Sequence, residues 1–300
     1  YRPHVVGFRA EAGLLDVLRE YASLTRRHVD AEIVLGGPTA TSHPAELLEQ
    51  AGADYVFAGE AEESFARFLQ LARQRNSRTD VPEIPGLAYR YADRTWVNTL
   101  PADGFGRSVL DAAPADAKGP FEAERRKLEN LQRPAPRVEV LGANRLDFSL
   151  LDGFRQPLES LFFTGGRGCP GVWTFCSRLH GSAVRAKSAR QILEEIGAAD
   201  RAVMEGRIGI DRWPLFRWAE GSPLRDREVG WAAVYDEDFF LSPRRAVEFF
   251  ALWNESPLRQ RYRLSVQTNP RSLLDREGRV RAELIAWIDR VKPMVQLGAE

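Results

Sequence analysis

Short apolar runs alternate with segments of helical periodicity along the first 76 residues of the chain. The runs are as short as buried strands are, and they lie at 5–8, 33–35 and 55–58. Apolar residues at helical spacing follow each run and predict helices around 14–21, over 44–50 and over 60–72. This repetition predicts an α/β fold with a parallel, doubly wound sheet. Because three strands are few for such a sheet, we expect only the later half of the domain.

A second alternation of strands and helices occupies the C-terminal half. Apolar runs predict strands at 161–163, 231–235, 262–268 and 294–297, and periodic segments predict helices over 188–198, 243–253 and 280–291. We expect these units to form part of a (β/α) barrel, in which the chemistry lies on the loops after the strands. Residues 79–158 are interpreted as a connector, with a hairpin over 86–98 and a linker rich in Pro, Ala, Asp and Gly over 101–120.

Composition limits the classes of partner. The chain holds 42 acidic and 42 basic residues, so its formal net charge is zero and no basic surface for nucleic acid is indicated. A hydrophobic fraction of 44% is enough for a core, which excludes wholesale disorder. No apolar run reaches the roughly 18 residues of a membrane span, and the first residues lack a signal-peptide pattern. We therefore expect a protein with no membrane span and no nucleic-acid partner.

The chain has two cysteines, Cys169 and Cys176, and both lie in one short segment. Such a count excludes a secreted disulfide framework and raises the question of a local metal or cluster site. Two other interpretations stay open at this point: the cysteines are ordinary buried small residues, or they form half of a zinc site.

The segment 163–177 reads Phe-Thr-Gly-Gly-Arg-Gly-Cys-Pro-Gly-Val-Trp-Thr-Phe-Cys-Ser. It resembles the cluster loop of radical S-adenosylmethionine enzymes, which follows the first barrel strand and carries three cysteines spaced C-x3-C-x2-C. In that family the three thiolates hold a [4Fe–4S] cluster, and the open iron binds S-adenosylmethionine. The segments 188–192 and 295–300 resemble the helix after that loop and the end of the fourth barrel strand.

The middle cysteine of this pattern is replaced by Trp173. An indole ring cannot ligate iron, because its nitrogen is only a hydrogen-bond donor. Three explanations remain open: a misread or recently mutated codon, a true loss of the cluster, or a substitute ligand. His180, four residues after Cys176, is the candidate substitute, although a loop histidine is more often a surface or hydrogen-bonding residue.

The N-terminal part is consistent with a cobalamin-containing branch of the same family. The segments 35–39 and 53–60 resemble the later half of a cobalamin-binding domain, and 84–89 resembles the link to the barrel. The His-bearing signature D-x-H-x-x-G of such domains is not present, and it would precede Tyr1. The resemblance implies a Rossmann-like cobalamin-binding half-domain over 1–78 and the first part of a radical S-adenosylmethionine TIM-type barrel over 159–300.

The resemblance also implies binding residues. Cobalamin contacts are expected in the loops after the second and third strands, at Gly36, Gly37, Pro38, Thr39, Gly59 and Glu60. The alternative interpretations are plain strand-to-helix turns and, for Glu60, a charge at a helix N-terminus. For S-adenosylmethionine, Phe175 would contact the adenine, Asp236 and Glu237 the amino group, and Glu300 another polar group. Ordinary packing and a solvated acidic loop are the alternatives for Phe175 and for Asp236 with Glu237.

As for function, the resemblance implies a metal-binding, cobalamin-dependent enzyme. Because a low-potential cluster with an open iron is sensitive to oxygen, the resemblance also implies a cytoplasmic, oxygen-protected location. Its relatives reduce the cluster with an electron donor such as flavodoxin or ferredoxin. They form a 5′-deoxyadenosyl radical and carry out methyl transfer or rearrangement at an unreactive carbon of a small molecule. A cluster-deficient pseudoenzyme that binds cobalamin or S-adenosylmethionine as a sensor or scaffold is the alternative. A plain zinc or iron protein is a third hypothesis.

Overall fold

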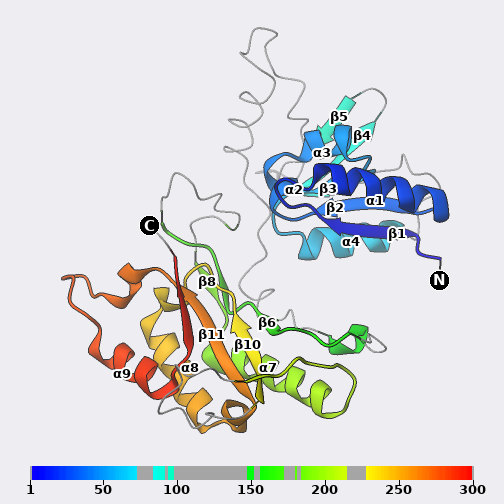
Figure 1. The fold of residues 1–300 in the computed structure, drawn as a ribbon. Helices are drawn as coiled ribbons and strands as arrows, with labels where there is room; N and C mark the ends of the chain where they lie inside the picture. Colours follow the sequence, from blue (N-terminus) through cyan, green and yellow to red (C-terminus); the bar gives the residue numbers. More distant parts are fainter. Residues whose placement is uncertain are drawn as a thin grey trace. The chain divides into compact units, whose positions relative to one another are not determined.

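The computed structural model of the chain describes residues 2–72, 84–91, 94–97, 147–151, 156–171, 180, 184–214 and 228–298 (Figure 1). The chain divides into two compact units. The first comprises Tyr1–Pro136 and Val172–Gly181, and the second comprises Arg137–Gly171 and Ser182–Glu300. Each unit contains its own sheet and its own core.

The first unit is built on a five-stranded sheet in the order β1-β2-β3-β4-β5. The strands are β1 (Val5–Arg9), β2 (Glu32–Gly36), β3 (Tyr55–Phe57), β4 (Leu87–Tyr91) and β5 (Arg94–Val97). The first three are parallel, as the sequence predicts. The expected hairpin is also present as β4 and β5, and β4 pairs antiparallel with β3, so the hairpin extends this sheet.

Helices cover both faces of the three parallel strands. They are α1 (Leu15–His28), α2 (Pro38–Ser42), α3 (Pro44–Gln50) and α4 (Glu62–Ala72). In β2, Ile33 and Leu35 join one core cluster with α1 and α3 side chains, whereas Val34 joins a second cluster with Phe68 of α4. Successive strand side chains point to opposite faces, so this split places α1 and α3 on one face and α4 on the other.

Two details of this unit differ from the sequence expectation. The short helix α2 directly after β2 was not predicted. The apolar residues at helical spacing in and just before α1 do not all face the core: Leu18 is buried, whereas the N-cap residue Leu14 and Tyr21 are 42% and 48% exposed. Ala22, one turn after Leu18, takes the second buried position on the helix instead.

The second unit has a parallel sheet in the order β12-β11-β10-β6. Its strands are β6 (Leu161–Phe163), β10 (Glu228–Val234), β11 (Tyr262–Thr268) and β12 (Met294–Leu297). The short strand β9 (Trp213–Pro214) pairs antiparallel with β10, and β7 (Gly166–Arg167) with β8 (Arg185–Ala186) forms a separate two-stranded ribbon. The four predicted strands are present and parallel; closure into a barrel remains a prediction.

Three helices alternate with these strands: α7 (Ala189–Met204), α8 (Pro243–Glu255) and α9 (Ala282–Val291). Neighbouring helices pack against one another as one layer, α7 on α8 and α8 on α9 (Figure 1). Their apolar stripes meet one face of the sheet in a single core, to which Leu161, Val234 and Val266 contribute from the strands. Among the described residues, no helix is both long and apolar enough to cross a lipid bilayer.

Short 3-10 turns complete the second unit. They are η2 (Phe148–Leu151), η4 (Phe239–Leu241), η5 (Pro257–Gln260) and η6 (Pro270–Leu273). Helix α7 continues six residues beyond the predicted end at 198, to Met204, because the inward spacing of Ile192 and Ile196 continues through Ala199 and Ala202. The whole of the predicted linker over 101–120 lies outside the described residues.

Candidate functional site

In the first unit, loops with a common orientation follow the three parallel strands. Chain direction places the loops after β1, β2 and β3 at the same edge of the sheet, where α/β proteins bind ligands. The loop after β2 is held at Ala10: its carbonyl accepts the N–H of Thr39 at 3.1 Å, and its own N–H donates to the Gly36 carbonyl at 2.7 Å.

Two of the glycines that the sequence singles out have backbone conformations that favour glycine. Gly37 has a φ of 103° and Gly59 a φ of 86°. A Cβ on Gly37 would lie 3.2 Å from the Ala10 carbonyl oxygen. Thr41 links the two loops, because its Oγ1 donates to the Gly37 carbonyl and accepts the Gly59 N–H, each at 3.0 Å. The structure therefore brings Gly37 and Gly59 together, through a threonine that sequence reasoning missed.

Glu60 follows Gly59 and is almost fully buried, with 3% of its side chain exposed. His180 Nδ1 donates to the Glu60 Oε1 at 3.0 Å, and His180 belongs with the first unit. The Nδ1 atom of His180 is therefore already used in a hydrogen bond to Glu60. This hydrogen-bonding role is the ordinary one for a loop histidine, and the substitute-ligand role stays a prediction.

In the second unit, the structure describes the cysteine loop from its start to Gly171. Gly168 precedes Cys169 with a φ of 88°. The Cys169 thiol is half-buried, and its Sγ accepts the N–H of Gly171 at 3.4 Å. Trp173, Phe175, Cys176 and Glu300 lie outside the described residues.

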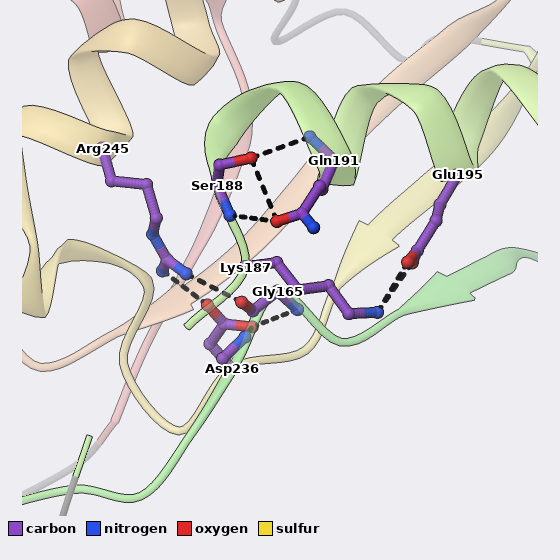
Figure 2. Close-up of polar contacts among 8 residues, drawn as sticks. Gly165, Lys187, Ser188, Gln191, Glu195, Asp236 and Arg245 are labelled. Atoms are coloured by element: carbon purple, nitrogen blue, oxygen red, sulfur yellow. Dashed lines mark hydrogen bonds and ion pairs between the residues drawn. The ribbon is translucent and has the colours of Figure 1, made fainter. Parts of the chain in front are cut away.

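The turn that leads into this loop is held by one buried carboxylate, Asp236. Its Oδ1 accepts the N–H groups of Gly165 and Gly166 at 2.7 and 2.6 Å. Its Oδ2 accepts Nη2 of Arg245 at 2.7 Å, and Arg245 Nη1 donates to the Gly165 carbonyl at 2.9 Å (Figure 2). Lys187 adds its own N–H to the same carbonyl at 2.7 Å.

Strand register explains why Asp236 meets these glycines. Val234 of β10 pairs with Phe163 of β6 in a parallel register. Two residues beyond each partner, Asp236 and Gly165 leave the sheet at the same edge. The approach requires glycine, since a Cβ on Gly165 would lie 3.2 Å from both Asp236 oxygens and 2.7 Å from Ile192 Cδ1.

Burial dominates the electrostatics of this carboxyl group. It raises the pKa of Asp236 above the ordinary value, because water no longer solvates the charged form. The Arg245 guanidinium and the two glycine amides oppose that rise. Arg245 is itself nine-tenths buried, so the ion pair is screened little by solvent.

The neighbouring acids of the same strand end have other partners. Glu237 Oε2 accepts the N–H of Gly168 at 3.1 Å. Asp238 is buried, accepts Oγ1 of Thr268 at 2.6 Å, and also accepts the N–H of Phe240 at 3.0 Å. The acidic segment is therefore not simply a solvated loop, because each of the three consecutive carboxylates accepts hydrogen bonds from other parts of the protein.

The N-terminus of α7 lies beside this network (Figure 2). Ser188 caps the helix with a reciprocal pair of bonds to Gln191, in which each side chain accepts the other residue's backbone N–H, at 3.2 and 2.9 Å. The segment 188–192, expected to form the helix after the cysteine loop, does so. Arg245 and Lys187 were missed by sequence reasoning, and no linear signal joins them to residue 165.

The donor set does not fit the cluster that the resemblance implies. A [4Fe–4S] cluster held by three thiolates needs three cysteines, and the chain has two. Trp173 occupies the remaining position and offers no lone pair. Within the described part of the chain, no group of three or more His, Cys, Asp or Glu residues is placed to hold a metal ion.

Solved structures provide the comparison with known proteins. The chain is similar to the radical S-adenosylmethionine methyltransferase TsrM from Kitasatospora setae with cobalamin and a [4Fe–4S] cluster bound, at a TM-score of 0.61 and 16% identity, over 100% of this chain and 50% of that chain. A second TsrM structure, with tryptophan substrate and a SAM analogue bound, gives a TM-score of 0.60 and 16% identity over 100% of this chain and 49% of that chain. The cobalamin-dependent S-adenosylmethionine radical enzyme OxsB with aqua-cobalamin bound gives 0.59 and 15%, over 99% of this chain and 35% of that chain.

Over its own length, the chain is similar in backbone fold to these cobalamin-dependent radical S-adenosylmethionine enzymes. It spans about half the length of TsrM and about a third of OxsB. No protein-family model matches the sequence, and no curated protein matches it either. The likeness therefore concerns the arrangement of the backbone, and at 16% identity it does not transfer residue roles.

Proposed function

We propose that this chain is part of a cobalamin-dependent enzyme of the radical S-adenosylmethionine kind, acting on a small molecule by methyl transfer or rearrangement at an unreactive carbon. The observation that supports it most is the likeness in fold to TsrM over the whole chain. The cysteine loop adds to it, because Cys169 lies where the resemblance to the family places the first thiolate. Electron supply by a flavodoxin or ferredoxin is part of the same proposal.

Cobalamin is proposed to bind the first unit at the loops after β2 and β3. Gly37 and Gly59 suit this role because glycine has no side chain, so a ligand can approach the backbone closely in these positive-φ turns. The remaining residues of the proposed site are Gly36, Pro38, Thr39 and Glu60. Bound cobalamin would supply the methyl-transfer chemistry, and the chain's share would be to bind and orient it.

S-adenosylmethionine is proposed to bind the second unit beside the cysteine loop. Phe175, Asp236, Glu237 and Glu300 remain the proposed contacts. Asp236 has its oxygens engaged by two amides and an arginine, so a ligand amino group would have to compete with partners of the protein itself.

Trp173 favours a second candidate function. If no other group replaces the third thiolate, the chain would bind cobalamin or S-adenosylmethionine without a cluster, as a sensor or scaffold. Both functions share the cofactor-binding fold and differ only in whether the cysteine loop holds iron. We therefore derive no reaction step through the cluster.

Iron and acid-labile sulfide, measured after anaerobic reconstitution, separate the two candidates. The parent chain is compared with Trp173→Cys and with Leu150→Cys. Leu150 is 83% exposed, so the latter variant adds a third thiol away from the loop and controls for adventitious iron. About four irons per chain in the parent and in Trp173→Cys would support the enzyme and show that another group replaces the third thiolate.

A cluster confined to Trp173→Cys would contradict the enzyme proposal for this sequence and favour the sensor or scaffold. Metal without acid-labile sulfide in every form would favour a plain zinc or iron protein. Cobalamin binding is measured separately, by the change in the cobalamin absorption spectrum on titration. We expect Gly37→Val to weaken it at least tenfold, because a side chain at φ 103° would strain the loop.

A further inference from the structure

Two consecutive carboxylates of the second unit bind the backbone immediately before Cys169. Asp236 accepts the N–H groups of Gly165 and Gly166, and Glu237 accepts that of Gly168 at 3.1 Å. The two side chains thus account for three of the four amides from Gly165 to Gly168. No side chain of the loop itself is needed for these bonds.

The same segment is the neck of the cysteine loop. Gly166 and Arg167 of β7 pair with Ala186 and Arg185 of β8, so the chain leaves and re-enters the unit at one place. Beyond this neck, the first residues of the loop have few other bonds among the described atoms. Gly168, at φ 88°, sets the direction in which the chain enters Cys169.

We propose that Asp236 and Glu237 are positioning residues that fix the backbone before Cys169 and thereby aim its thiol. Arg245 takes part by holding the Asp236 carboxylate in place. The role differs from contact with the S-adenosylmethionine amino group, since it acts through the protein's own amides. What Cys169 would hold depends on the proposed function, whereas the backbone geometry does not.

Physical chemistry favours carboxylates for this task. A carboxylate accepts N–H groups in charge-assisted bonds that are shorter and about twice as strong as neutral ones. Two amides within 2.7 Å of one oxygen fix the orientation of two peptide planes together. Glycines at 165 and 166 permit this approach, because side chains there would displace the carboxylate.

Glu237 gives the sharper test, because Asp236→Ala would also leave the Arg245 cation buried without its partner. The variants Glu237→Ala and Glu237→Gln are made in a Cys176→Ser chain, so that alkylation reports on Cys169 alone. Glu248→Ala, which removes an exposed carboxylate from α8, is the matched control. All measurements use the metal-free full chain.

Two rates are measured. Hydrogen exchange in a peptide spanning 164–169 reports on the amides, and iodoacetamide alkylation reports on the thiol. In Glu237→Ala we expect the exchange of one amide, that of Gly168, to become about tenfold faster, as loss of a charge-assisted bond implies. Alkylation of Cys169 should rise several-fold. Glu237→Gln should restore both rates, because its amide oxygen accepts the same N–H.

Unchanged exchange and alkylation in Glu237→Ala would overturn the proposal. So would a Glu237→Gln variant that behaves like Glu237→Ala, since the bond would then not be the cause. Exchange and alkylation are measured on the metal-free chain, so their outcome does not depend on whether the cluster can be reconstituted. Conversely, Glu237→Ala could show faster exchange and still form a normal cluster. That result would count against a positioning role for Glu237 and would leave the proposed function standing.

Discussion

Lys187 Nζ lies 2.8 and 2.9 Å from the two carboxylate oxygens of Glu195, and both side chains are about 95% buried. Lys187 precedes the cap of α7, and Glu195 lies on the second turn of that helix. The pair therefore ties the strand that leaves the cysteine loop to the helix that follows it. Its low exposure makes it sensitive to the loss of either partner.

Lys187→Met is expected to destabilise the chain by about 3 kcal/mol, because the Glu195 charge would stay buried without compensation. The double variant Lys187→Met with Glu195→Met should recover most of that loss, since it removes both charges. The free energy of unfolding is measured by urea denaturation, and variants are compared where their m-values are equal. Arg207→Met, at an exposed pair with Glu205, is the control and should cost no more than about 1 kcal/mol. Equal losses in the single and double variants would contradict the argument.

Gly165→Ala is expected to destabilise the chain by about 1–3 kcal/mol, as overpacking does. The added Cβ would lie 2.7 Å from Ile192 Cδ1. Ile192→Val removes that atom, so the double variant should be about 1 kcal/mol more stable than the sum of the two single changes predicts. Thermal and urea unfolding of the four chains complete the cycle. Strict additivity would show that Ile192 is not the obstacle.

Gly197→Ala should act in the opposite direction. Gly197 lies inside α7, and its added Cβ would meet only Arg201 Nη1, at an ordinary 3.7 Å. Alanine is favoured over glycine in a helix interior by about 0.5–1 kcal/mol, so we expect a gain of that size. The midpoint of urea unfolding measures it. A loss of stability would contradict this prediction.

Tyr262→Phe should flatten the loss of stability at alkaline pH. Burial, and then the Asp200 carboxylate, raise the pKa of Tyr262 above its usual value of 10.0. The unfolded chain therefore gives up this proton first. The contribution of Tyr262 to stability is complete below the unfolded value of about 10 and is lost as the pH rises beyond it.

Unfolding free energies between roughly pH 9 and pH 11 test this prediction. The exposed residue Tyr235, replaced by Phe, is the matched control. The fall in stability with pH should be shallower in Tyr262→Phe than in the parent. An equal slope in Tyr262→Phe and Tyr235→Phe would contradict the assignment.

Much of the fold could be predicted because its signals are local. The strand limits predicted at 262–268 and 294–297 are those of β11 and β12, and Pro44 marks the start of α3. Such runs carry their own periodicity and their own boundaries. The region of α1 shows the limit of this reasoning, since Leu14 and Tyr21 have the right spacing and yet are each more than 40% exposed. Apolar spacing predicts a face, but packing decides which of its residues are covered.

The sequence by itself determined the order and type of the elements, the place of the cysteine loop and the replacement of its middle cysteine by Trp173. These depend on neighbouring residues only. Tertiary structure decided which side chains meet: Asp236 is 71 residues from Gly165 and Arg245 80 residues from it, yet they form one network. The reason is strand register, because pairing of Val234 with Phe163 brings both strand ends to one edge of the sheet. Register is a property of two strands together, and no single segment of sequence contains it.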